Sequence, residues 1–193
     1  MNLRDELASY VPYNEQEARD RRLLLGYLER AEAEGPEAVV RLYGRDGPAH
    51  MTASAWVVSP DRQQVLMAYH NIYQSWSWLG GHVDGELDLR TVALREVREE
   101  SGLTSAKIVR PDILSVEVLC VDGHEKHGAY VSSHLHLNVT YLLEADDRSP
   151  LHVCEDENKG VSWFSLEDAL AASTEPWFVK RIYQKLNDKL KMV

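Results

Sequence analysis

Residues 81–103 read GHVDGELDLRTVALREVREESGL, and the rest of the chain can be interpreted outward from this stretch. A helix is predicted over residues 88–101, with Asp88 as its N-cap and Gly102 as its C-terminal stop. At about 100° per residue, Glu96, Glu99 and Glu100 project from one side of that helix. The same side carries the apolar residues Leu89, Val92 and Ala93. The acidic and apolar faces therefore coincide, whereas a solvated run of charges lies opposite the apolar stripe.

Three carboxylates that face the protein body repel one another and need a cation among them. A hard divalent cation with oxygen ligands suits this set, and Mg²⁺ is the first choice. Such a site leaves coordination positions for water and phosphate oxygens, and one carboxylate can deprotonate the water. Arg95 could orient Glu96 or contact phosphate, with an outward-facing side chain as the alternative. The alternative is a surface helix whose glutamates are neutralised by Arg95 and Arg98, but the coincident faces favour the metal site.

Length and composition narrow the class of protein. The chain has 193 residues, of which 44% are hydrophobic and 27% charged, as expected for a folded protein. The net charge of −10 argues against a surface for long nucleic acid, but a bound metal would still allow a small anionic ligand. No signal peptide and no apolar run of ~18 to 20 residues is found. Cys120 and Cys154 are too few for a disulfide framework, so we expect a cytoplasmic protein. The lack of a long apolar run predicts that it has no membrane partner.

The first 47 residues are predicted to form a helical extension. Asn14 followed by Glu17 resembles a capping box, and Gly35-Pro36 stops the helix. Leu24, Leu28 and Ala31 form an apolar stripe on it. The stripe could cover the main sheet or a second subunit, so a homodimer is one option. The turn cluster at residues 44–48 marks the boundary to a second unit, residues 48–193.

Residues 48–193 alternate between strand and helix patterns without strict βαβ order, which predicts a mixed sheet between helical layers. Strands are expected at 53–58, 65–69, 107–109, 113–121, 133–143 and 160–164, a polar loop at 122–130, and helices at 165–172 and along the C-terminus. The C-terminal helix repeats apolar residues every four positions, which is typical of an amphipathic cover.

Two further groups of residues are candidates for binding. His134 and His136 share one face of a strand and could chelate zinc, but no cysteine or carboxylate spacing completes a zinc motif, and HEKH at 124–127 is not HExxH. We therefore expect them to line a polar cleft and contact a substrate phosphate or base, with exposed or core histidines as the alternative. Trp78 could stack on a base, although aromatic residues beside a strand more often pack in the core.

The stretch at 81–103 resembles the Nudix box, in which a glycine, five residues, a glutamate and seven residues precede Arg-Glu-apolar-X-Glu-Glu-X-Gly-apolar. The matching positions are Gly81, Arg95, Glu96, Val97, Glu99, Glu100, Gly102 and Leu103. One position departs from the pattern, because Leu87 stands where it has glutamate and Glu86 comes one place earlier. Either Glu86 substitutes through a shifted turn at Asp84-Gly85 or the contact is missing, and we favour substitution.

The resemblance implies an α/β/α sandwich and hydrolysis of a diphosphate linked to another group, often a nucleoside. It implies that Glu96, Glu99 and Glu100 bind Mg²⁺ or Mn²⁺, that Gly81 shapes the turn at the substrate site, and that Glu96 is a ligand or the base. In many members the base comes from a loop outside the box, and Glu157 is our choice there; a solvated acidic loop is the alternative. A nucleotide-binding module without hydrolysis is the rival function. An isopentenyl diphosphate isomerase is disfavoured, because a site of that kind has a catalytic cysteine ahead of the box helix and Gly80-Gly81-His82 contains none.

Overall fold

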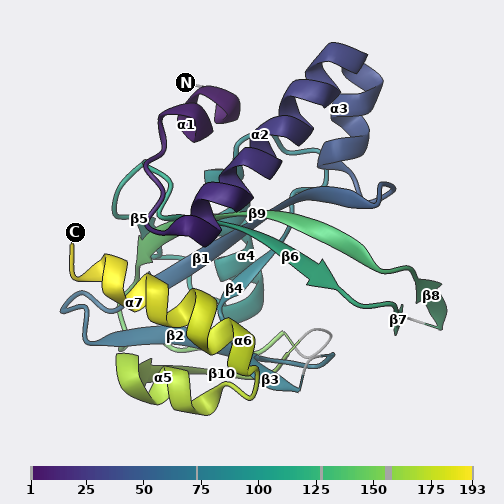
Figure 1. The fold of residues 1–193 in the computed structure, drawn as a ribbon. Helices are drawn as coiled ribbons and strands as arrows, with labels where there is room; N and C mark the ends of the chain where they lie inside the picture. Colours follow the sequence, from purple (N-terminus) through teal and green to yellow (C-terminus); the bar gives the residue numbers. More distant parts are fainter. Residues whose placement is uncertain (1, 73, 127, 155–157, 193) are drawn as a thin grey trace.

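The computed structural model describes residues 2–72, 74–126, 128–154 and 158–192. The strands of its main sheet are β1 (Ala49–Val58), β2 (Gln64–His70), β3 (Ser75–Ser77), β4 (Leu79–His82), β5 (Lys107–Ile108), β6 (Ser115–Val121), β9 (His134–Glu144) and β10 (Asn158–Ser165). The helices are α1 (Leu3–Ser9), α2 (Glu15–Glu34), α3 (Pro36–Tyr43), α4 (Leu89–Ser101), α5 (Leu166–Ala172), α6 (Pro176–Phe178) and α7 (Gln184–Leu190). Figure 1 shows their arrangement.

The sheet is mixed, as predicted. Its strand order is β10-β2-β1-β9-β5, with β3 paired to β2, β4 to β1 and β6 to β9. Only the β1–β9 pair is parallel among the pairs described, and it is the longest, running from Ala49 opposite Leu135 to Val58 opposite Glu144. Because neighbouring strands place residues of equal register on one face, this pair aligns His50 with His136 and Thr52 with Asn138.

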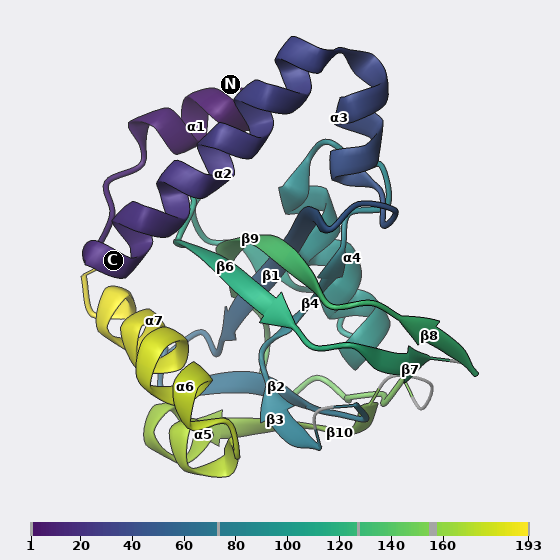
Figure 2. The same cartoon turned by 45° about the vertical axis from the view of Figure 1, so that its right-hand side comes forward.

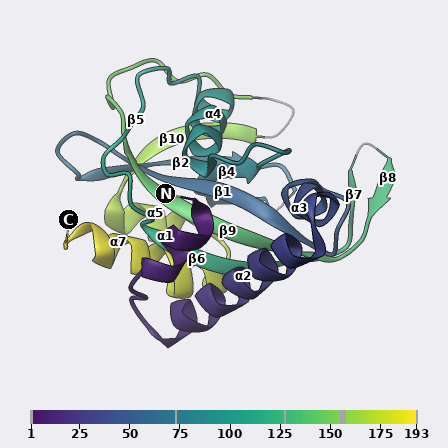
Figure 3. The same cartoon turned by 90° about the horizontal axis from the view of Figure 1, so that it is seen from above.

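Helices cover both faces of the sheet. Seen from above, α4 lies over one face, while α2 and α7 lie over the other (Figure 3). Leu89, Val92 and Val97 of α4 are buried against the sheet. The C-terminal segment buries Ile182, Leu186 and Leu190 on the second face, as its four-residue repeat predicts. The α/β/α sandwich is therefore confirmed.

The N-terminal extension packs on the same chain. Asn14 caps α2 by accepting a hydrogen bond from the Glu17 amide, and Gly35 ends the helix. Leu24, Leu28 and Ala31 are buried in a core cluster that also contains residues of the sheet. The apolar stripe that suggested a homodimer is thus already covered, and it offers no surface for a second copy. The division at residue 47 stays a proposal, although the two parts share one core.

Some local predictions were wrong or incomplete. Residues 122–130, predicted as a loop, contain most of a hairpin formed by β7 (His124–Lys126) and β8 (Ala129–Val131), which extends from one end of the sheet (Figure 2). Alternating polar residues around two glycines hid this pairing. The C-terminal helix contains a π-helical segment at Val179–Tyr183. Cys120 and Cys154 are free thiols, and Cys120 is exposed while Cys154 is half-buried.

No helix among the described residues is long and apolar enough to span a membrane.

Buried charges connect α2, the sheet and α7. Glu17 of α2 is fully buried, and its carboxylate lies 2.6 Å from the Lys189 ammonium and 3.1 Å from that of Lys185. Lys185 also pairs with buried Glu117 of β6 at 2.9 Å. Asn138 donates to the other Glu117 oxygen at 3.0 Å. Since buried charges need partners, this four-residue cluster, Glu17, Glu117, Lys185 and Lys189, fixes how both helices dock on the sheet.

Acid should weaken this cluster in a defined pH range. Burial alone would raise the pKa of Glu17, but Lys185 and Lys189 lower it to about 2, below the ordinary 4.5. The contribution of Glu17 to stability is therefore complete above about pH 5 and is lost as the pH falls toward about 2. We expect the gap in unfolding free energy between the wild type and Glu17→Gln, measured by urea unfolding, to shrink across this range. A gap that stays constant down to about pH 3 would contradict the assigned ionisation.

Candidate functional site

Helix α4 forms as the sequence predicts. Asp88 is its N-cap and accepts a hydrogen bond from the Arg90 amide, while Gly102 ends it in the left-handed conformation at φ 74°. Glycine adopts that conformation without the steric penalty of a side chain. The apolar residues of the first turns are buried against the sheet. Their packing fixes the orientation of the helix and so places the glutamates at its C-terminal end.

The three glutamates of α4 are not equivalent. Glu96 and Glu100 are buried, with 8% and 4% of their surfaces exposed, and they face the strand that precedes the helix. The Glu99 side chain is 59% exposed. The prediction that all three turn toward the protein body is therefore wrong for Glu99, because a step of three residues carries it about 60° away from Glu96. The arrangement has two buried carboxylates and a third at their rim.

Both buried carboxylates are held in place. Glu100 accepts hydrogen bonds from the Gly80 amide at 2.7 Å and from the Asn158 side-chain amide at 3.0 Å. Arg95 donates to Glu96 Oε1 at 2.7 Å and to the His82 carbonyl at 2.6 Å. Of the two roles predicted for Arg95, orientation of Glu96 is the one that its contacts support. Sequence reasoning missed Asn158, which is buried and lies far along the chain in β10.

Gly81 lies directly against Glu96. A Cβ atom at this position would be 2.4 Å from Glu96 Oε2 and 2.7 Å from its Cδ. Contacts this short do not occur, so a side chain at residue 81 must displace the carboxylate. Gly80, with φ 158°, would place a Cβ 2.5 Å from the Ala53 carbonyl oxygen. The glycine pair thus allows β4 to approach the acidic end of α4.

We expect Gly81→Ala to reduce turnover strongly while leaving the fold intact. The clash is with the end of a flexible side chain, so Glu96 can move, but a displaced catalytic group can cost about 10²-fold in rate. Hydrolysis rate and unfolding free energy should be measured together. Gly26→Ala in α2 is the matched control, because a Cβ there meets nothing within 4 Å. Equal turnover in both variants would show that Glu96 tolerates displacement.

The structure shows the surroundings of Glu86 and Leu87, where the sequence departs from the Nudix pattern. The Glu86 carboxylate accepts a hydrogen bond from the Asp88 amide at 2.9 Å, just before α4 begins. The turn is made by Asp84 and Gly85, both with positive φ. Leu87 is 62% exposed. That Glu86 replaces the missing glutamate as a support for the metal site stays a prediction, since its described contact is with the start of the helix.

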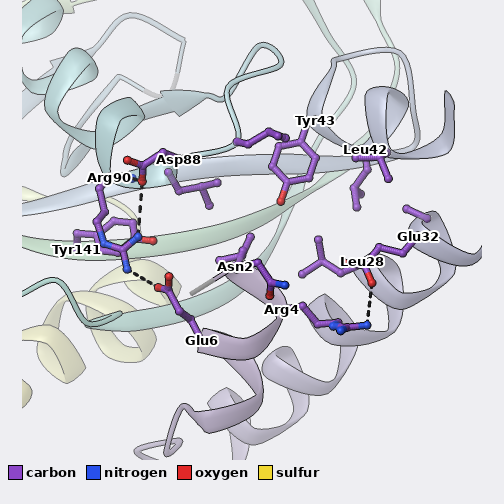
Figure 4. Close-up of a pocket in the computed structure, with 15 residues that line it drawn as sticks. Asn2, Arg4, Glu6, Leu28, Glu32, Leu42, Tyr43, Asp88, Arg90 and Tyr141 are labelled. Carbon is purple, nitrogen blue, oxygen red and sulfur yellow. Dashed lines mark hydrogen bonds and ion pairs between the residues drawn. The ribbon is translucent and has the colours of Figure 1, made fainter. Parts of the chain in front are cut away.

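A cavity of about 480 Å³ lies beside Leu87, between the N-terminal helices and the start of α4. Its lining includes none of the three glutamates of α4. Figure 4 shows its charged side chains already paired, Arg90 with Glu6 and Asp88, and Arg4 with Glu32. We therefore do not place the chemistry in this cavity.

The remaining predicted residues have different surroundings. Trp78 is 9% exposed and packs edge-on against Tyr183, so it belongs to the core, the alternative that the sequence left open. His134 and His136 lie side by side and are joined by His50 of β1 and His82 of β4. Sequence reasoning missed the last two, because they come from other strands. Glu157, the predicted base, lies outside the described residues.

The glutamate set fits a hard divalent cation. Its donors are all carboxylate oxygens, which Mg²⁺ and Mn²⁺ prefer. Glu96 and Glu100 are fixed by Arg95, Gly80 and Asn158, while the exposed Glu99 leaves one side of the site accessible. Arg95 pairs with Glu96, and a cation would add the positive charge that favours two neighbouring buried carboxylates. The donor chemistry and the burial therefore agree with a metal site open to a phosphorylated ligand.

Comparisons with known proteins give a consistent result. Residues 48–186 match the family model described as NUDIX domain. Among solved structures, Ap4A hydrolase from C. elegans is similar at 20% identity and a TM-score of 0.52, covering 74% of this chain and 95% of that one. The Nudix hydrolase RenU from M. smegmatis has 15% identity, a TM-score of 0.54 and coverages of 78% and 88%. The MutT protein from Methanosarcina mazei Go1 has 20% identity and a TM-score of 0.51, and the match covers 76% of this chain and 98% of that one. No curated protein matches. At these identities, the solved structures show a shared fold.

Proposed function

We propose a reaction for this chain, which belongs to the Nudix family of hydrolases. In this proposal it uses Mg²⁺ or Mn²⁺ to hydrolyse the diphosphate of a nucleoside diphosphate derivative or related organic pyrophosphate. Membership of the family makes it a hydrolase that cleaves pyrophosphate linkages. The metal, the class of substrate and its cytoplasmic location are our proposals. The observation that carries them is the pair of buried carboxylates, Glu96 and Glu100, held beside the glycines of β4.

Each side chain has a separate role in this proposal. Glu96, Glu99 and Glu100 hold the cation, with Glu99 at the open side where a phosphate can approach. When bound, the cation supplies Lewis acidity for attack of water on phosphorus. Arg95 is a positioning residue that fixes the Glu96 carboxylate. Glu96 accepts the proton of the attacking water if no other base does so, and Glu157 is the alternative.

A binding module without hydrolysis is the second candidate. Leu87 favours it, because a hydrophobic and exposed residue stands where the family pattern has glutamate. Hydrolysis is favoured because Glu96, Glu99 and Glu100 are all present and the family is one of hydrolases.

A hydrolysis screen tests the proposal. Nucleoside triphosphates, nucleotide sugars, ADP-ribose, dinucleoside polyphosphates and non-nucleotide diphosphates should be incubated with the protein and Mg²⁺ or Mn²⁺. We expect phosphate or nucleotide product from at least one class, and its loss on chelation of the metal. Binding of one class without product under both metals would favour the module.

A further inference from the structure

Four histidines meet at one end of the main sheet. They are His50 at the start of β1, His82 at the end of β4, and His134 and His136 at the start of β9, called the histidine cluster below. One ligand atom from each lies within 4.8 Å of the others. The register of the sheet explains this, because His50 is aligned with His136 and Thr52 with His82. Within the described residues, no other set of three or more His, Cys, Asp or Glu side chains brings its ligand atoms together as closely.

The rings face one another closely. The centroid of His50 is 4.8 Å from that of His134 and 5.0 Å from those of His82 and His136. The Nε2 atoms of His134 and His136 are 3.1 Å apart. In tetrahedral zinc sites, Zn–N distances of about 2.0–2.1 Å place two nitrogens about 3.4 Å apart. Two of the four nitrogens are therefore already at the spacing of zinc ligands, and the others need only small ring movements.

The buried histidine of the cluster lacks the partners that a buried imidazole needs. His50 is 2% exposed, and its ring nitrogens make no hydrogen bond of good geometry, although the Gly47 backbone interacts with the ring. Buried polar groups in native proteins are normally satisfied. Its ring instead points to the other three histidines. A cation among the four rings would supply the missing partner.

The hydrogen bond of His134 agrees with a cation bound among the four rings. The Nδ1 atom of His134 is 2.8 Å from the Ser132 carbonyl. A carbonyl only accepts, so Nδ1 carries the proton and Nε2 presents its lone pair to the cluster, as in ligating histidines. Neutral imidazole is the form that binds metal.

We propose that the histidine cluster binds one Zn²⁺ ion through His50, His82, His134 and His136, as a structural site separate from the carboxylates of α4. Four neutral imidazoles suit a borderline-soft transition metal rather than Mg²⁺. The ion would tie together the ends of β1, β4 and β9. His82 connects the two sites, because its carbonyl accepts from Arg95, which holds Glu96. The role replaces the substrate contact predicted for His134 and His136.

Zinc content measures the proposal directly. Untagged protein is stripped with a chelator, dialysed against Zn²⁺ and analysed for bound metal. We expect one Zn²⁺ per chain in the double variant Glu96→Gln/Glu100→Gln, in which the carboxylate site is removed, so the result does not depend on the proposed hydrolysis. Substitution with Co²⁺ should give the visible spectrum of a tetrahedral site.

Ligand variants complete the test. His134→Ala and His136→Gln should each weaken Zn²⁺ binding by more than about 100-fold. Changing a residue that only supports a metal ligand already lowers the affinity by about 10–100-fold. Zn²⁺ should raise the melting temperature of the wild type but not of these variants. His152→Ala, an exposed histidine outside the cluster, should bind as the wild type does. His134 is half-exposed, so its variant should fold even if that of His136 does not. No zinc in the wild type, or equal zinc in folded His134→Ala, would overturn the proposal.

Discussion

Replacing Glu100 or Glu96 by glutamine should lower the hydrolysis rate by about 10³-fold or more, with the largest effect at saturating substrate. Loss of a ligand that places a catalytic cation removes several kcal/mol of transition-state stabilisation, and about 1.4 kcal/mol corresponds to tenfold in rate. Glutamine keeps the shape of the side chain but has one acceptor oxygen, whereas Glu100 accepts from Gly80 through Oε1 and from Asn158 through Oε2. The rate should be measured over a range of Mg²⁺ concentrations.

The matched control is Glu29→Gln on the exposed face of α2, which should keep the wild-type rate. Glu99→Gln should also lower turnover, and it isolates the exposed ligand, because its burial and the fold are unaffected. Unfolding free energies of all four variants show whether a loss of rate reflects the site or the fold. Wild-type rates in a folded Glu100→Gln protein would rule out the metal assignment.

Glu17→Gln should destabilise the protein by about 3–5 kcal/mol, the largest effect we expect on folding. The substitution leaves two buried ammonium groups, those of Lys185 and Lys189, with less compensating charge, and removing one partner of a buried ion pair costs that much. The remaining carboxylate, Glu117, contacts Lys185 but is not an ion-pair partner described for Lys189. Urea unfolding at neutral pH measures the change.

Glu15→Gln provides the comparison within the same helix. Glu15 also forms an ion pair, with Arg19 at 2.6 Å, but both side chains are largely exposed. Exposed pairs contribute about 0–1 kcal/mol, so this variant should stay close to the wild type. A loss below about 1 kcal/mol for Glu17→Gln would mean that the buried charges do not hold α2 and α7 to the sheet.

The sequence predicted best what is encoded locally. Helix α4, its caps and the burial of Glu96 and Glu100 follow from residues within one short stretch, where helical spacing decides which side chains share a face. Glu99 shows the limit of this reasoning. It shares a broad side of the helix with the other two glutamates, but the helical step of about 60° from Glu96 leaves its side chain 59% exposed.

What the sequence could not predict depends on partners brought from elsewhere in the chain. Asn158 reaches Glu100 from 58 positions away, through the pairing of β10 with β2. His134 and His136 are visible as a pair at i and i+2, but His50 and His82 join them only through the register of β1 with β9 and β4. Glu17 looks like a capping residue in the sequence, and only the docking of α2 shows that it is buried among lysines.

Hydrolysis in water enriched with ¹⁸O tests the central claim most directly, that the carboxylates of α4 support attack of water on a diphosphate. The protein is incubated with Mg²⁺ and the best substrate of the screen, and the products are analysed by mass. We predict one ¹⁸O atom in a phosphate group of the products of the wild type, and no labelled product above background from the folded Glu96→Gln/Glu100→Gln protein. Label in a non-phosphate product, or equal labelling by both proteins, would contradict the account.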